Sequence, residues 1–210
     1  MVRRLSAEPV GVPLGAGPLH AVVLGASTGG PPVVEKLLRD LPRDFCAAIA
    51  LCQHMPPGFT SVWAQRLDGI CKLDVKEANP GGSFEPGIVH VAPIGKHMRL
   101  VREDDGEVTI RLDADFADSL HVPSIDILMS SAAQAFGSRM LAVLMTGLGA
   151  DGALGMLAVR RAGGHTLCQS ADSALAYSMP GSAVELGAVE EEVSADEMAA
   201  VITDRVRGVL

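Results

Sequence analysis

The sequence is poor in aromatic residues and lacks long apolar runs and an excess of basic charge. Only 3% of the 210 residues are aromatic, so a core must consist mainly of aliphatic side chains and methionine. No apolar run approaches the roughly 20 residues of a membrane-spanning helix, so we expect no membrane insertion. The 17 Lys and Arg are outnumbered by 25 Asp and Glu, and the net charge of −8 argues against nucleic-acid binding.

Cysteine pairs and secretion signals are also missing. The cysteines at positions 46, 52, 71 and 168 form no C-x-x-C pair, so we expect reduced thiols and neither a disulfide framework nor a zinc site. The basic residues at the start are followed by a segment rich in Pro and Gly, where a signal peptide would have a continuous apolar region. The other histidines, outside position 54, lack metal-ligand spacing. We therefore expect a cytoplasmic protein that holds no metal.

The most informative stretch follows the first apolar run. Val22-Val23-Leu24 leads into Gly25-Ala26-Ser27-Thr28-Gly29, which fits G-x-S-x-G, and a helical pattern begins at once. Such an elbow presents a serine at the carboxyl end of a strand, beside a helix N-terminus that stabilises negative charge. The same residues also suit a dinucleotide-binding turn or an ordinary tight turn, so the elbow alone does not decide the function.

Alternating strand and helix patterns predict an α/β fold. We expect a doubly wound, mainly parallel sheet with helices on both faces and an antiparallel hairpin region at one side. Residues 1–19 are expected to be a flexible leader, and residues 20–210 to be one catalytic domain. The predicted strands are 21–24, 47–52, 140–145 and 165–168. The predicted runs of the hairpin region are 88–92, 97–102 and 108–112. The predicted helices are 31–41, 59–67, 123–136, 153–162 and 198–209.

Ser27, His54 and Asp151 each follow a predicted buried strand. Because the carboxyl ends of parallel strands lie along one edge of a sheet, we expect these side chains to converge. Ser27 would attack a carbonyl, His54 would move the proton, and Asp151 would hold the imidazole. Each residue also has a simpler explanation, since Ser27 or Asp151 can cap the helix that follows it and His54 can belong to a proline turn.

Five motifs then identify a family that the chain resembles. From about residue 21 to 193 the sequence is similar to the catalytic domain of the protein-glutamate methylesterase of bacterial chemotaxis. The resemblance implies a serine hydrolase that demethylates glutamyl methyl esters on receptor signalling helices and also deamidates glutamine there. It assigns the roles of nucleophile, base and orienting acid to Ser27, His54 and Asp151. The motifs are Gly25–Gly30, Gln53–Phe59, Pro123–Leu128, Thr146–Gly152 and Ser178–Pro180.

The resemblance also implies an oxyanion hole. At some positions this sequence departs from the family's usual pattern. A backbone N–H of Leu148, which replaces the usual methionine, would bind the oxyanion, with Thr28 as a supporting residue and no cofactor. Val122 and Gly181 stand where the family typically has basic residues, so docking of an acidic receptor helix is put in doubt. Only about 19 residues precede the first predicted strand, so we expect no receiver domain within this chain.

Two rival functions are weighed against the esterase. A short-chain dehydrogenase would use the Gly-rich turn for its cofactor, but Pro31 stands where the third glycine belongs. The second strand lacks an acidic residue at its end, and Tyr177 has no lysine four residues on. A non-enzymatic regulatory module with a vestigial site is opposed by the intact Ser27, His54 and Asp151, but the missing basic residues keep this alternative open.

Overall fold

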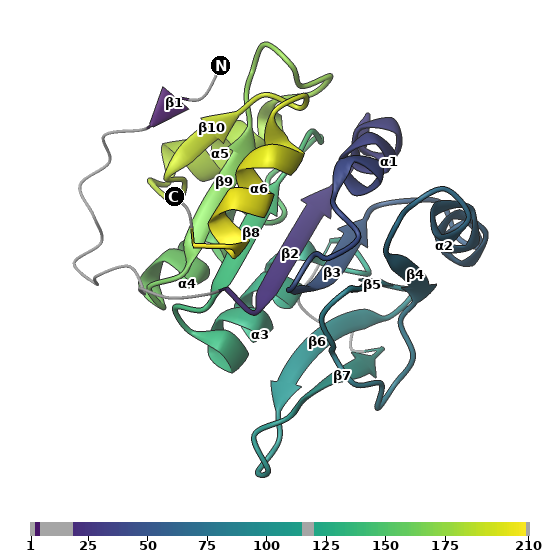
Figure 1. The fold of residues 1–210 in the computed structure, drawn as a ribbon. Coiled ribbons are helices and arrows are strands. Elements are labelled where there is room, and N and C mark those ends of the chain that lie inside the picture. Colours follow the sequence, from purple (N-terminus) through teal and green to yellow (C-terminus); the bar gives the residue numbers. More distant parts are fainter. Residues whose placement is uncertain (1–2, 5–18, 115–119, 209–210) are drawn as a thin grey trace.

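A mainly parallel sheet runs through the centre of the structure (Figure 1). The computed structural model describes residues 3–4, 19–114 and 120–208. The strand order is β1-β10-β9-β8-β2-β3-β5-β4, and only β1 pairs in the antiparallel sense. The strands are β1 (Arg3–Arg4), β2 (Ala21–Ala26), β3 (Ala48–Gln53), β4 (Asp74–Glu77), β5 (Ile88–Val91), β8 (Met140–Leu144), β9 (His165–Gln169) and β10 (Glu191–Val193).

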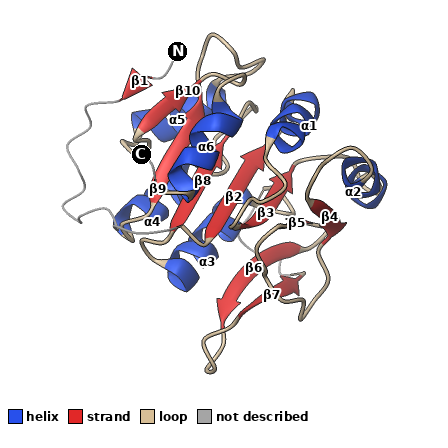
Figure 2. Ribbon diagram, in the orientation of Figure 1, coloured by secondary structure: helices blue, strands red, loops and turns tan. Residues whose placement is uncertain are grey.

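Helices cover both faces of this sheet, as Figure 2 shows in blue and red. One buried cluster contains apolar residues of α1, α2 and α6, and the other contains those of α3, α4 and α5. The helices are α1 (Gly30–Asp40), α2 (Thr60–Asp68), α3 (Ile125–Phe136), α4 (Ala153–Arg161), α5 (Ser178–Glu185) and α6 (Met198–Val206). The predicted fold class, a doubly wound parallel sheet, is confirmed.

The strands at the centre of the sheet are fully buried, which explains their unbroken apolar runs. Every residue of β2, β3 and β8 is buried, and β2 pairs in parallel with β3 on one side and β8 on the other. The chain crosses from one side of β2 to the other at this place. Such a switch point puts loops with opposite directions side by side at the carboxyl ends of the strands, where ligands bind in open α/β sheets.

The antiparallel region is smaller than predicted. Two strands, β6 (His97–Arg102) and β7 (Val108–Asp113), form a separate antiparallel hairpin that packs against α3. The prediction was wrong for the run at 88–92, because β5 joins the main sheet in parallel with β3 and β4. Its short apolar sequence carries no signal of strand direction, which is set by the pairing partner.

Four elements of the main sheet and its layers had no counterpart in the predictions. β1 lies within the predicted leader and pairs with β10, and β4 is short and mostly charged. α5 contains Pro180 and Gly181, and β10 begins with two glutamates that are buried. Most of the predicted leader, 1–19, lies outside the described residues. Within the described part of the chain, no helix is long and apolar enough to cross a membrane.

Candidate active site

Three neighbouring strands carry the predicted site residues at their carboxyl ends. Ser27 directly follows β2, His54 directly follows β3, and Asp151 lies in the turn between β8 and α4. Backbone hydrogen bonds continue the sheet into these ends: the N–H of Ser27 donates to the carbonyl of Thr146 (3.0 Å) and the N–H of His54 to that of Ala26 (3.0 Å). The parallel register therefore brings the three positions to one edge.

His54 and Asp151 are in direct contact. Nε2 of His54 lies 2.8 Å from Oδ2 of Asp151, and their side chains are 11% and 9% exposed. Burial would raise the pKa of Asp151, but hydrogen bonds from His54 and from the backbone N–H groups of Asp126 and Ile125 outweigh it and lower the pKa from 3.8 to about 2. Asp151 is thus an ionised acceptor at neutral pH, as an orienting acid requires.

The ionised carboxylate also determines the tautomer of His54. A carboxylate can only accept, so Nε2 of His54 carries the hydrogen and donates it to Asp151. Nδ1 then keeps its lone pair, and it is buried without a hydrogen-bond partner. This nitrogen, rather than Nε2, is the one able to take a proton from a nucleophile.

Asp151 sits at the N-terminus of α3, a helix remote from it in sequence. Its Oδ1 accepts from the hydroxyl of Ser124 (2.9 Å) and from the N–H of Asp126 (3.0 Å), and its Oδ2 accepts from the N–H of Ile125 (2.8 Å). Four donors, counting His54, therefore fix this carboxylate at the positive end of a helix dipole. The rigid setting holds the imidazole through the bond between His54 and Asp151.

The simpler explanation considered for Asp151, a cap on the helix that follows it, was wrong. α4 has Gly152 at its N-cap with no side-chain cap. Instead, Oδ1 of Asp126 in α3 accepts from the N–H groups of Gly152 (2.9 Å) and Gly155 (2.6 Å). Asp151, which precedes α4, accepts hydrogen bonds from the N-terminus of α3, and Asp126 of α3 accepts them from the N-terminus of α4. This exchange is possible because α3 and α4 begin side by side. Sequence order could not reveal this exchange.

Ser27 is held by its backbone rather than by its side chain. Nε2 of Gln53 donates both to the carbonyl of Ser27 (2.8 Å) and to that of His54 (3.0 Å), so one buried amide joins the two positions. Ser27 does not cap α1, whose N-cap is Gly29. Within the described residues its hydroxyl makes no hydrogen bond, to His54 or otherwise. Contacts between nucleophile and base are often loose before substrate binds.

The turn after β8 leaves one backbone donor available beside Ser27. Gly147 donates its N–H to the carbonyl of Ala176 (2.9 Å), and Gly149 donates to the hydroxyl of Ser178 (3.1 Å). In the described part of the chain, the N–H of Leu148 between them makes no hydrogen bond, and neither does that of Thr28, the residue after Ser27. Oxyanion holes are built from backbone N–H groups that are free in this way.

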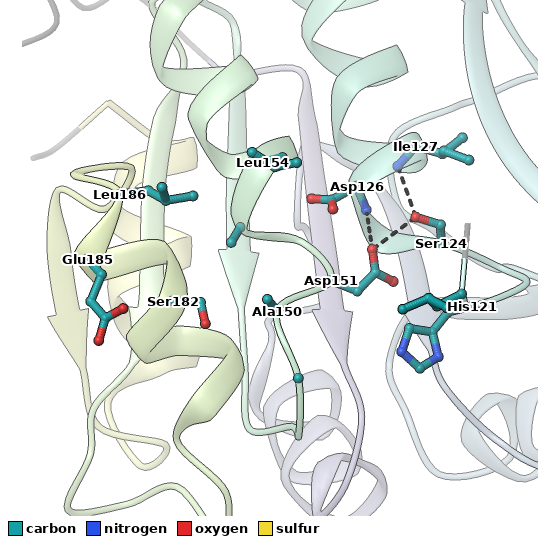
Figure 3. A pocket seen from close by; sticks show the side chains of 13 residues that line it. His121, Ser124, Asp126, Ile127, Ala150, Asp151, Leu154, Ser182, Glu185 and Leu186 are labelled. Atoms are coloured by element: carbon teal, nitrogen blue, oxygen red, sulfur yellow. Dashed lines mark hydrogen bonds between the residues drawn. The ribbon is translucent and has the colours of Figure 1, made fainter. Parts of the chain in front are cut away.

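A pocket of about 670 Å³ borders on Asp151 on the side of α3, α4 and α5 (Figure 3). It is lined neither by Ser27 nor by His54, so it adjoins the predicted site and does not contain it. Its walls include the exposed side chains of Leu154 and Leu186, with the carboxylates of Asp126 and Glu185. No lysine or arginine lines it among the described residues.

Sequence reasoning missed three residues that shape this site. Gln53 and Ser124 hold the backbone of Ser27 and the carboxylate of Asp151, and His121 lies against the ring of His54. All three belong to or adjoin motifs singled out in the sequence, but no spacing rule assigned them a role. In the described ranges, no group of three or more His, Cys, Asp or Glu side chains is arranged to hold a metal ion.

Comparison with known proteins supports one family throughout. The family model described as CheB methylesterase matches residues 22–202. A protein-glutamate methylesterase/protein-glutamine glutaminase 2 of Nitratidesulfovibrio vulgaris is 44% identical over 181 residues, which cover 86% of this chain and 49% of the relative. One from Bordetella avium is 47% identical over 173 residues, 82% of this chain and 49% of the relative. The chain thus spans about half the length of these curated relatives.

A solved structure agrees with the fold. The crystal structure of the Thermotoga maritima CheB methylesterase catalytic domain superposes with a TM-score of 0.85 at 34% sequence identity. The match covers 89% of this chain and 98% of the other. The sheet, its helical layers and the hairpin therefore correspond to a known catalytic domain over nearly its entire length.

Proposed function

The chain belongs to the CheB methylesterase family, and from this premise we propose that it is a serine hydrolase acting on glutamyl methyl esters through Ser27, His54 and Asp151. The observation that carries the proposal is the pairing of His54 with an ionised Asp151 next to the strand end that bears Ser27. Such a pairing orients a base and leaves its other nitrogen without a hydrogen-bond partner, able to take a proton.

The first half of the reaction forms an acyl-enzyme. Oγ of Ser27 attacks the ester carbonyl carbon while Nδ1 of His54 takes the hydroxyl proton. The backbone N–H groups of Leu148 and Thr28 bind the oxyanion that develops, a role in which the side chain at 148 is irrelevant. The intermediate then collapses, the bond to the methoxy oxygen breaks, and the proton passes from His54 to release methanol.

The second half returns the enzyme to its starting state. A water molecule gives a proton to Nδ1 of His54 and attacks the acyl carbon, and the bond to Oγ of Ser27 breaks as that oxygen takes the proton back. The products are a glutamate side chain and methanol. With a glutamine amide in place of the ester, the same steps release ammonia, so we propose deamidation as a second activity of this site. Neither reaction needs a cofactor.

The substrate we propose is a receptor signalling helix that carries methylated glutamates in the cytoplasm. A residue within a protein helix can reach Ser27 only at an open edge, and Leu148 beside it is 60% exposed. The four cysteines are unpaired, which fits a reducing compartment. A catalytic domain over 20–210 preceded by a leader is part of this proposal.

Docking of the helix would depend less on basic residues than the family pattern implies. The pocket beside Asp151 carries Asp126 and Glu185 and exposes several leucines. Because an acidic segment is repelled by carboxylates, we propose that apolar contacts contribute most of the recognition at this edge.

A fluorophosphonate probe tests the nucleophile without knowledge of the receptor. It reacts with activated serines, so the wild-type protein is expected to gain one covalent label on Ser27 and the folded Ser27→Ala variant none. A dehydrogenase or a vestigial module would not be labelled. Absence of labelling in the well-folded wild-type protein would therefore contradict the proposal.

A further inference from the structure

A second imidazole lies flat against His54. The ring centroids of His54 and His121 are 4.2 Å apart and the ring planes differ by 19°, a stacked arrangement. His121 is exposed and precedes α3, whereas the side chain of His54 is 11% exposed. His121 thus covers a face of the predicted base, while Asp151 holds one edge. Figure 3 shows His121 beside Asp151 and Ser124 in the pocket wall.

Contacts of the residues that follow His121 help to set its position. The carbonyl of Val122 accepts from the N–H of Gly95 (3.3 Å), and the N–H of Ser124 donates to Nδ1 of the buried His97 (3.1 Å). Ser124 also donates its hydroxyl to Asp151. The backbone that carries His121 is therefore tied to the same carboxylate that orients His54, and the two imidazoles share one framework.

Stacking against His121 restricts the rotation of the His54 ring, which the hydrogen bond to Asp151 alone does not prevent. A single bond at Nε2 leaves the ring of His54 able to swing about that contact, because the terminal torsion of a histidine is broad. A stacked ring with its centroid 4.2 Å away removes this freedom and fixes the direction in which Nδ1 points.

We infer that His121 is a positioning residue for the catalytic histidine, acting through its aromatic face rather than through a proton or a contact to substrate. The inference rests on the proposed function of the site. An aromatic pair of this kind contributes a factor of about 3 to 10 to the step it assists. The contribution should appear in kcat, because the ring acts on His54 and not on the bound ester.

The experiment compares His121→Ala, His121→Leu and His121→Phe on a small activated aryl ester, which needs no receptor docking. Both Ala and Leu remove the aromatic face, and Leu keeps most of the volume; Phe keeps the face. We expect kcat to fall about 3- to 10-fold with Ala and Leu, with KM within twofold, and to recover to near the wild-type value with Phe. His20→Ala, an exposed histidine at the opposite end of β2, is the control and should leave kcat unchanged.

The outcomes separate this inference from the proposed function. Wild-type kcat in the Ala and Leu variants, an equal loss in all three variants, or a rise in KM alone would each overturn the role of His121. If the Ala variant does not fold, the comparison of Leu with Phe decides. Ester cleavage that persists in Ser27→Ala would instead refute the nucleophile, and with it the proposed function, whatever His121 does.

Discussion

Nε2 of His54 lies 2.8 Å from Oδ2 of Asp151, and this contact assigns the two nitrogens of the imidazole. The nitrogen bound to the carboxylate carries the hydrogen, which leaves Nδ1 as the nitrogen able to accept a proton. In the serine-protease template the assignment is reversed, with Nδ1 toward the aspartate. The same chemistry is available in both orientations, because either ring nitrogen can accept a proton when the other is held.

Asp151→Asn should reduce turnover by about 10²- to 10⁴-fold, because a neutral amide neither fixes the tautomer of His54 nor stabilises the imidazolium. Steady-state kinetics on an activated ester measures the loss. Since the pKa of Asp151 is lowered to about 2, activity lost between pH 7 and pH 4 must come from protonation of another group. A wild-type rate in the folded variant would exclude Asp151 from the mechanism.

The same pKa shift predicts how stability depends on pH. The pKa of Asp151 is about 2 in the folded protein against an ordinary 3.8, so ionisation of this carboxylate stabilises the fold above pH 3.8 by roughly 2 kcal/mol. This contribution is lost as the pH falls toward 2. The difference in unfolding free energy between wild type and Asp151→Asn should be constant from pH 7 to 5 and shrink below pH 4. A difference that grows on acidification would contradict the assignment.

Gly147→Ala should strongly impair the site. A Cβ at position 147 would lie 2.7 Å from Cβ of Ser27 and closer still to Sδ of Met179, so Ser27 must move. Displacements of about 1 Å at a reacting atom can cost a factor of about 10² in rate. Gly69→Ala is the matched control, because its new Cβ would lie 3.6 Å from the carbonyl oxygen of Arg66, an ordinary contact. Equal kcat in both variants would contradict the close packing of the turn against Ser27.

Ser124→Ala should weaken both the helix and the site. The hydroxyl of Ser124 accepts from the N–H of Ile127 (3.3 Å) at the start of α3 and donates to Asp151. Loss of an N-cap of this type costs about 1 kcal/mol in unfolding free energy, and Asp151 would lose one of its donors. Ser83→Ala, at an exposed position, serves as the reference. Chemical denaturation measures the difference, and identical stability of the two variants would refute the capping role.

Val122→Arg should favour an acidic receptor helix over a small ester. Val122 follows His121 at the edge of the pocket, and a cation there would attract acidic segments. We expect kcat/KM for the receptor to rise several-fold at low salt and the gain to shrink at high salt, with little change for the small ester. Gly181 is the less suitable position, since a Cβ there would lie 3.2 Å from the ring of Tyr177. Equal gains for both substrates would contradict the docking argument.

The strands that could be predicted from the sequence are those in which every residue is buried. β2, β3 and β8 are covered on both faces, so their apolar runs identified them directly. β10 could not be recognised, because Glu191 is buried only through its ion pair with Arg205 of α6 (2.8 Å). α5 contains Gly181 and, in its first turn where proline is tolerated, Pro180, and it packs against α4. Both depend on tertiary contacts that a local pattern does not contain.

The candidate site likewise contains residues that a local sequence pattern predicts and residues that only tertiary contacts bring into place. Ser27, His54 and Asp151 follow recognisable strands, so topology alone brought them to one edge. The support for these residues comes from contacts across the sheet edge: Ser124 with Asp151, Gln53 with Ser27, and His121 with His54. None of these pairs has a spacing that a sequence rule describes, because each joins separate elements. The interchange of caps between Asp126 and Asp151 is hidden for the same reason.

The most direct test of the account is release of methanol from methylated receptors. Membranes that carry receptors with radiolabelled methyl groups are incubated with the wild-type chain and with a folded Ser27→Ala variant, and volatile label is counted. The account predicts that the wild-type chain releases labelled methanol and that the variant releases no more than the buffer control. Equal release by the two proteins, or none by a wild-type chain that hydrolyses small esters, would contradict the claim that Ser27 cleaves glutamyl methyl esters.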